Sequence, residues 1–178
     1  MRTTTIGNKG ERLVQNIVEA LGFTIIKKWN TDSSWDLVIK NNDVTKSLEV
    51  KTQPDYLEYG GFSVELGNKK LGNYAFKPTD FIWDGVSCVY TGITVSKADT
   101  HVFTNGKNII YLISTKVLLD WLKRIYTDNR HKIKFGGYDG RSLQAQITIE
   151  EIEKLGQKID LRRKRGRKPI SVPSQSCV

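Results

Sequence analysis

Three charged residues in two short hydrophobic segments have the types and spacing of a hydrolytic site. Asp36 lies in the segment SSWDLVIK, and Glu49 and Lys51 lie two residues apart in SLEVKTQ. Both segments are predicted to be strands, in which successive side chains alternate between the two faces. Glu49 and Lys51 are therefore expected to share one face of a sheet.

The segment that joins these two strands predicts their register. A two-residue turn at Asn42 and Asp43, both of which tolerate left-handed backbone, would set Asp36 directly across from Glu49. Their Cβ atoms would then lie about 4.5–5.5 Å apart. Like charges at that spacing destabilise a sheet unless something compensates them, so we expect a compensating partner.

A divalent cation is a natural partner for two opposed carboxylates. Mg2+ prefers oxygen ligands and keeps several waters, and a bound cation makes its water easier to deprotonate. Lys51 could orient or deprotonate that water, or stabilise the transition state as a fixed positive charge. In the alternative interpretation, Asp36 merely begins a strand, and Glu49 and Lys51 form a solvent-facing ion pair.

The elements around these residues are predicted from periodicity and turn signals. A helix is predicted over NKGERLVQNIVEALG, with Asn8 as its N-cap and Gly22 as its stop. Strands are then predicted at 23–29, 35–40, 47–52 and 62–66, in the apolar segments DFIWDG and SCVYTGITV, and in a hairpin through Asn105 and Gly106.

The C-terminal half continues with helices and one more strand. Ser114 is predicted to cap an amphipathic helix, TKVLLDWLKRIY, that should lie on the sheet. The segment SLQAQITI alternates like an edge strand. Thr148 and Glu151 form a capping-box pattern for a short helix at 149–159. The sequence shows no internal repeat.

This order of elements resembles the PD-(D/E)xK nuclease superfamily, in particular its Holliday-junction-resolvase-like and phage nuclease branches. GNKGERLV resembles the family's helix motif, WDLVI its aspartate-bearing strand and EVK its Glu-x-Lys strand. The resemblance covers residues 7 to about 155 and implies an α/β, restriction-endonuclease-like fold, with a mixed β-sheet core flanked by helices. The chain departs from the family name in one position, because Trp35 stands where that name has proline.

The resemblance also implies an activity and its residues. Asp36, Glu49 and the backbone carbonyl of Val50 would bind Mg2+, for which Mn2+ can substitute, and Lys51 would be the activating base or charge stabiliser. The implied protein is a metal-dependent DNA endonuclease that hydrolyses phosphodiester bonds, with branched or junction DNA among its candidate substrates. The alternative is a non-catalytic nucleic-acid-binding protein on the same fold.

Four further polar residues have open assignments. Glu11 would be an auxiliary catalytic residue and metal ligand by resemblance, but it also lies three residues after Asn8, where a glutamate suits a capping box. Gln53 resembles a position that helps to hold the site, or it is an ordinary polar residue at a strand end. Glu65 could approach the metal or the nucleic acid, or face solvent. Asp80 suits a turn or cap better than a ligand.

The C-terminal end is strongly basic. Lys and Arg number 28 against 19 Asp and Glu, and residues 1–161 carry only +3 of the net +9. We therefore predict a nuclease-like domain at 1–161 and a flexible basic tail at 162–178 that orders on DNA, although an acidic membrane or plain solvation would suit the same charge. The expected DNA-binding residues are Arg162, Arg163, Lys164, Arg165, Arg167 and Lys168.

The tail also resembles an AT-hook. In such a peptide, arginines around a glycine enter the narrow minor groove of A·T-rich DNA, as Arg165-Gly166-Arg167 could. Lys168 stands where the usual hook has proline. Non-specific phosphate binding is therefore the favoured interpretation.

Composition limits the other classes of protein. Cys88 and Cys177 cannot make a disulfide framework, and with only His101 and His131 a structural zinc site is not expected. No apolar run reaches the length of a membrane span, and the N-terminus lacks a signal-peptide pattern. We expect a cytoplasmic protein, located in the host cytoplasm if it is phage-encoded. Its expected partner is DNA, and we do not expect it to bind a membrane. The resolvase-like resemblance further implies a homodimer.

Overall fold

The computed structural model describes residues 3–28, 35–42, 44–69, 88–90, 92–128, 132–136 and 142–162. Its helices are α1 (Thr3–Ala20), α2 (Thr115–Asp128) and α3 (Ile149–Leu155), with a 3-10 turn, η2 (Gly92–Thr94). Its strands are β1 (Thr24–Lys28), β2 (Leu37–Asn41), β3 (Val44–Thr52), β4 (Gly61–Lys69), β5 (Cys88–Tyr90), β6 (Thr100–Thr104), β7 (Ile109–Ser114), β8 (Ile133–Gly136), β9 (Ser142–Thr148) and β10 (Gln157–Asp160).

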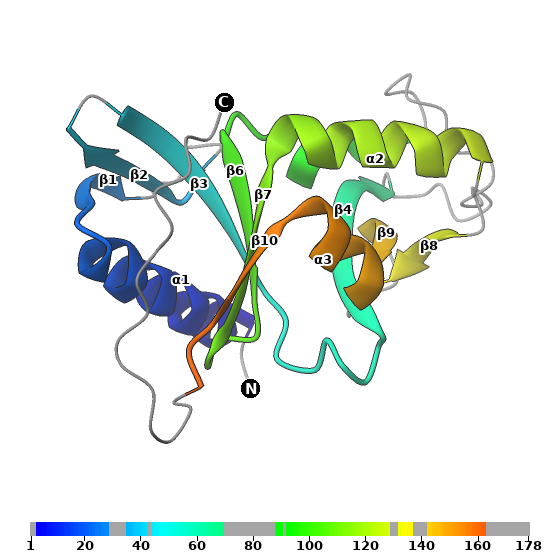
Figure 1. The fold of residues 1–178 in the computed structure, drawn as a ribbon. Helices are drawn as coiled ribbons and strands as arrows, with labels where there is room; N and C mark the ends of the chain where they lie inside the picture. Colours follow the sequence, from blue (N-terminus) through cyan, green and yellow to red (C-terminus); the bar gives the residue numbers. More distant parts are fainter. Residues whose placement is uncertain are drawn as a thin grey trace.

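These strands form two sheets (Figure 1). The first is mixed, with the order β1-β2-β3-β6-β7-β10, in which β3 and β6 run parallel and the other neighbours antiparallel. The second is antiparallel, with the order β5-β4-β9-β8. A six-stranded mixed sheet flanked by helices confirms the predicted α/β fold class with a mixed-sheet core.

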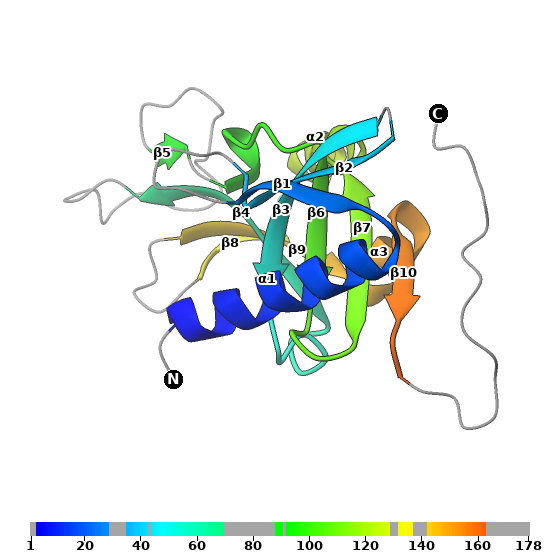
Figure 2. The ribbon, with the colours of Figure 1, turned by 90° about the vertical axis from the view of Figure 1, so that its left-hand side faces the viewer.

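Hydrophobic cores lie on both faces of the first sheet. α1 crosses one face (Figure 2), where Val14 and Val18 pack against Val50 and Val102. On the other face, α2 and the second sheet pack against Phe103, Tyr111 and Ile113 of β6 and β7; the buried partners include Phe62, Val64, Leu118, Trp121, Leu122, Leu143 and Ile147. Because side chains alternate along β3, the residues between its core-facing positions turn away from α1.

α1 begins earlier than the sequence pattern predicts. It starts at Thr3, so Asn8 lies inside the helix and the prediction that Asn8 is the N-cap is wrong. Asn8 is exposed, where a polar residue costs a helix little. Glu11 therefore cannot complete a capping box with Asn8. The predicted stop is confirmed, because Gly22 has φ 83° and its N–H donates to the carbonyl of Glu19 at 2.9 Å.

Both predicted hairpins are present. In the β2–β3 hairpin, Asn42 has φ 47° and residue 41 pairs with residue 44, as the turn pattern predicts. In the β6–β7 hairpin, the Asn105 side chain accepts from the backbone N–H groups of residues 107, 108 and 109 at 2.9–3.1 Å. Gly106 in that loop has φ 69°, which favours glycine.

Four predictions for the chain after residue 79 need correction or lie outside the described residues. β9 is an inner strand between β4 and β8, not an edge strand. The Thr148–Glu151 capping box is confirmed, but α3 ends at Leu155, and residues predicted to continue it form β10 along β7. The segment GITV holds the 3-10 turn, not a strand. DFIWDG lies outside the described residues.

α3 stops where a new ladder begins. Gly156 has an extended backbone, with φ −126° and ψ 173°, and Gln157–Asp160 then pairs with β7. This pairing uses backbone groups of β7 that would otherwise form an open sheet edge. None of the described helices is both long enough and apolar enough to span a membrane.

Candidate catalytic site

The β2–β3 hairpin brings together the three residues from which the sequence argument began. The hairpin register places Asp36, one residue before β2, across from Glu49, and the Asp36 N–H donates to the Leu48 carbonyl at 2.8 Å. The Asp36 Oδ2 atom accepts a hydrogen bond of 2.6 Å from the Val50 N–H. Lys51 Nζ lies 2.7 Å from Glu49 Oε1. Asp36, Glu49 and Lys51 therefore form one cluster, which we call the hairpin triad.

Burial shapes the charges of the two carboxylates. Burial raises the pKa of Asp36, and Glu11 adds to this, while the Val50 N–H and Lys51 only partly oppose it. Burial likewise raises the pKa of Glu49, which Lys51 lowers and which Asp36 and Glu65 raise further. Burial therefore disfavours the charged form of both carboxyl groups, a penalty that a bound cation would offset.

Lys51 is held in its charged form. Burial alone lowers the pKa of Lys51, but the carboxylates of Glu49, Asp36 and Glu65 raise it above its usual value. The Lys51 side chain is 36% exposed and that of Glu49 14%. An ammonium group in this state donates hydrogen bonds and supplies positive charge; it does not accept a proton.

The triad fits a cation with few protein ligands. Within the described ranges, no three His, Cys, Asp or Glu side chains converge as a metal-binding group. Asp36 and Glu49 are hard oxygen donors, and Mg2+ is commonly bound by one or two carboxylates together with waters and substrate phosphates. The donor set therefore suits Mg2+ better than a metal that requires a complete protein cage. The role of the Val50 carbonyl stays a prediction.

Glu11 lies close enough to influence the triad. It stands on α1, and its charge helps to raise the pKa of Asp36. Its Oε1 atom lies 4.0 Å from the position that a Cβ on Gly7 would occupy, so the side chain extends along α1. Its role as an auxiliary ligand stays a prediction, and the capping alternative is removed by the position of the helix start.

Gln53 contacts the second sheet. Its Oε1 atom accepts from the Ser63 N–H at 3.0 Å, and its Nε2 atom donates to the Gly61 carbonyl at 3.4 Å. Both ends of the amide are thus used by the backbone of β4. These contacts fasten the end of β3 to the beginning of β4, so Gln53 is suited to positioning and not to direct chemistry.

Two residues near the triad had little or no signal in the sequence. Glu65 on β4 acts on the pKa of both Glu49 and Lys51, and only the alternation of FSVEL hinted at it. His101 on β6 lies in register with Glu49. Burial, followed by the charge of Lys51, lowers the pKa of His101 to about 4. His101 could have been found only by foreseeing that β3 and β6 pair in parallel.

The predicted DNA-binding tail is described only at its first residue. The exposed Arg162 side chain forms an ion pair with Asp160, and its backbone N–H donates to Asp160 Oδ1 at 3.0 Å. Residues 163–168 and Asp80 lie outside the described residues. In this arrangement Arg162 is already paired with a carboxylate and is a weaker candidate for phosphate than the sequence suggests.

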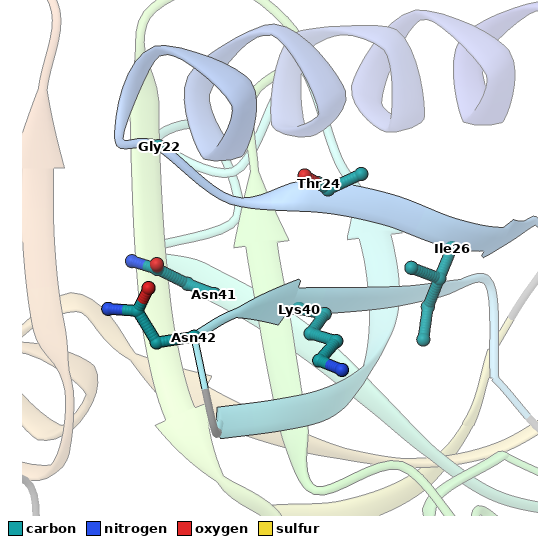
Figure 3. Close-up of a pocket in the computed structure, with 6 residues that line it drawn as sticks. All are labelled: Gly22, Thr24, Ile26, Lys40, Asn41 and Asn42. Carbon is teal, nitrogen blue, oxygen red and sulfur yellow. The ribbon is translucent and has the colours of Figure 1, made fainter.

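One depression lies away from the triad. It has a volume of about 400 Å3 on the β1–β2 hairpin (Figure 3) and is lined by Gly22, Thr24, Ile26, Lys40, Asn41 and Asn42. No residue of the triad lines it. The two sites are therefore separate, and the chemistry of the triad gives this depression no role.

Comparisons with known proteins add one structural likeness. No protein-family model and no curated protein sequence matches the chain. Among solved structures, a bacterial homing endonuclease, I-Ssp6803I, is similar with a TM-score of 0.49 and 15% identity, over 95% of this chain and 85% of that one. The assignment of the site rests on the geometry of the triad.

Proposed function

We propose that this protein is a metal-dependent DNA endonuclease of the PD-(D/E)xK type, with Asp36 and Glu49 as Mg2+ ligands. The observation that carries the proposal is the hairpin triad: two half-buried carboxylates opposed by the register of the β2–β3 hairpin, with Lys51 Nζ 2.7 Å from Glu49 Oε1. Mn2+ is expected to substitute for Mg2+. Glu11 and the Val50 carbonyl are proposed as auxiliary ligands.

The chemistry follows from what each group supplies. Bound Mg2+ would lower the pKa of a water molecule and stabilise charge on phosphoryl oxygens. Lys51 would hold its positive charge against the phosphate that is being cleaved, because its raised pKa keeps it protonated at neutral pH. Of the two roles open for Lys51 from the sequence, charge stabiliser is therefore preferred over general base.

DNA is the substrate that the net charge favours. The chain carries +9, and six basic residues occupy the seven positions 162–168. Such a segment adds phosphate affinity without sequence preference. We also propose a homodimer, because symmetric cleavage of two strands needs two sites. Four-way junctions, flaps, duplex and single strands are the substrates to be compared.

The test is a cleavage assay on that substrate panel with Mg2+. Asp36→Ala and Glu49→Ala should abolish cleavage and leave DNA binding nearly intact, since each removes a ligand while relieving like-charge repulsion. Glu150→Ala is a matched control, because this exposed glutamate pairs with Lys154 on α3, a different element. Full activity in either folded triad variant would contradict the proposal.

The same assay addresses the non-catalytic alternative. If the wild-type protein binds DNA but cuts no substrate with Mg2+ or Mn2+, the fold serves recognition alone. Cleavage that persists unchanged in a chelator would instead reject the cation while keeping the enzyme. These two outcomes separate the class of protein from the mechanism of the site.

A further inference from the structure

His101 is buried beside the triad, and the proposed reaction gives it no role. β6 lies between β3 and β7 (Figure 1), and its parallel register sets His101 beside Glu49. His101 is 1% exposed. Because paired residues of neighbouring strands point to the same face of a sheet, His101 shares the face of Glu49 and Lys51.

The hydrogen bonds of Thr115 fix the tautomer of this imidazole. The Thr115 hydroxyl donates to the Ala98 carbonyl at 2.5 Å. The same oxygen lies 3.0 Å from His101 Nδ1. A hydroxyl has one proton to donate, so Thr115 must accept the second bond and His101 Nδ1 must carry the hydrogen. In the neutral ring, the lone pair is therefore on Nε2.

That lone pair has no partner in the described part of the chain. His101 Nε2 is shielded from solvent and makes no hydrogen bond there. Leaving a buried acceptor unpaired is unfavourable, and such atoms in native structures usually have a specific reason. The ring is thus a fixed, neutral acceptor held next to two residues of the triad.

Lys51 is the donor best placed to complete this bond. Of the side chains that neighbour His101 on this face, Phe103 and Ile113 are apolar. The Ser47 hydroxyl is already bonded to Asp99 Oδ2 at 2.8 Å. Lys51 has three N–H groups and lies diagonally across from His101, a separation of about 7–8 Å that long side chains span.

We propose that His101 is a positioning residue for Lys51. When the Lys51 ammonium leaves Glu49, it donates a hydrogen bond to His101 Nε2. The inference rests on the proposed function, in which Glu49 gives its oxygens to a cation and so attracts Lys51 less. A neutral acceptor keeps the ammonium in the site without cancelling its charge. Lys51 then stays available to the phosphate and does not move into solvent.

The first test needs no substitution. Nitrogen NMR of the imidazole in the metal-free wild-type protein at neutral pH should show a neutral ring with hydrogen on Nδ1. That tautomer is required, because only then can Nε2 accept. A charged ring or hydrogen on Nε2 would overturn the proposal, whatever the protein does to DNA.

The second test measures Lys51 directly. In a Glu49→Gln background, the Lys51 ammonium has lost its charged partner and should be held by His101. Adding His101→Asn, which keeps a donor near Nδ1 for Thr115 but removes Nε2, should raise the acylation rate of Lys51 several-fold. Lys116, which is exposed on α2, is the internal reference. Equal acylation rates in the two proteins would reject the proposal.

The third test uses cleavage and separates positioning from packing. His101→Asn should lower kcat by about 10- to 100-fold, a range typical of residues that orient a catalytic group. The KM for DNA should stay within about threefold. His101→Gln, whose amide reaches the position of Nε2, should recover most of the loss. If His101→Asn and His101→Gln have equal kcat, or if their losses of kcat follow their losses in melting temperature, His101 contributes only to packing.

The tests also distinguish this inference from the proposed function. If the wild-type protein cuts no DNA, the proposed function fails, while the tautomer and the acylation rates still decide whether His101 holds Lys51. If cleavage is metal-dependent and the His101 variants behave as wild type, only the inference fails.

Discussion

The raised pKa values of Asp36 and Glu49 predict how the stability of the folded protein depends on pH. Both pKa values are raised in the folded protein, chiefly by burial. A carboxyl group whose folded pKa lies above its unfolded pKa favours folding below the unfolded pKa, and this contribution is lost as pH rises through the folded pKa. The metal-free protein should therefore carry a penalty at neutral pH that acidification relieves.

Asp36→Asn should remove this penalty. The asparagine oxygen can still accept from the Val50 N–H, which donates to Asp36 at 2.6 Å, but no charge is buried. We expect a melting temperature about 2–4 °C higher at pH 7 without metal, the shift that about 1 kcal/mol produces in a domain of this size. The gain should shrink as pH falls and wild-type Asp36 becomes protonated.

Asp120→Asn is a suitable control for that measurement. Asp120 is exposed on α2 and lies 3.9 Å from Lys123, a surface ion pair that contributes little. Its melting temperature should match the wild type at every pH. A fall in melting temperature for Asp36→Asn at pH 7 would contradict the view that the buried charge is uncompensated.

With Mg2+ present, Asp36→Asn should melt at a lower temperature than the wild type, the reverse of the order expected without metal. A ligand that binds only the folded protein stabilises it by mass action, by about 2.7 kcal/mol at one hundred times its Kd. Thermal scans should show a rise in the wild-type melting temperature with Mg2+ or Mn2+, and no rise in the Asp36→Asn, Glu49→Gln double variant. Equal rises in both proteins would place the cation elsewhere.

At the scale of elements, the hairpin was predictable and its neighbours were not. The Asn42 turn and the alternation of β3 are local signals, so the register that opposes Asp36 to Glu49 could be derived before the structure was known. The parallel pairing of β3 with β6 joins strands separated by about fifty residues, and no local signal marks it. His101 was missed for that reason.

β10 shows a second limit of local patterns. Its residues follow α3 and were predicted to extend that helix, but they pair with β7. The decision was made by tertiary context, because the edge of β7 offers backbone partners that outweigh a weak helical preference. The capping box at Thr148 and Glu151 was predictable because it lies within four residues.

Gln53 connects the two sheets, and its loss should be felt as an element effect. Gln53→Ala removes a bond of 3.0 Å to the Ser63 N–H and leaves that group unpaired, which typically costs about 1–3 kcal/mol when the group is buried. Urea unfolding should show a lower midpoint, and hydrogen exchange at the Ser63 amide should be faster. Cleavage should fall less than in Asp36→Ala, because the triad itself is intact.

Gln157→Ala is the matched comparison for Gln53. Gln157 is exposed on β10, so its truncation should change the urea midpoint little. If Gln53→Ala unfolds at the wild-type midpoint and yet loses all cleavage, Gln53 takes part in the chemistry directly. That outcome would give Gln53 a catalytic role in place of a positioning role.

At the scale of the whole molecule, the charge is divided unevenly between a nearly balanced body and a basic end. Residues 1–161 carry +3, and the six basic residues of 162–168 carry the rest. Arg162 pairs with Asp160, so the other five residues are the cations available to phosphate. Deleting residues 163–178 therefore removes a segment that can release up to about five counterions from DNA.

This deletion should change affinity and its salt dependence together. With a slope of about −0.9 per neutralised phosphate, the plot of log affinity against log salt should flatten by up to roughly four to five units, and by about two to four if only some residues bind. The truncated protein should still cut its substrates, with a loss of affinity that grows with salt, because phosphate contacts position a protein without specifying sequence.

The loss of affinity on A·T-rich and on G·C-rich duplexes distinguishes the two forms of tail. If the tail is an AT-hook, its deletion should lower affinity more on A·T-rich DNA, whereas deletion of a phosphate-binding arm should lower affinity equally on both duplexes. An unchanged slope would mean that the tail does not contact DNA.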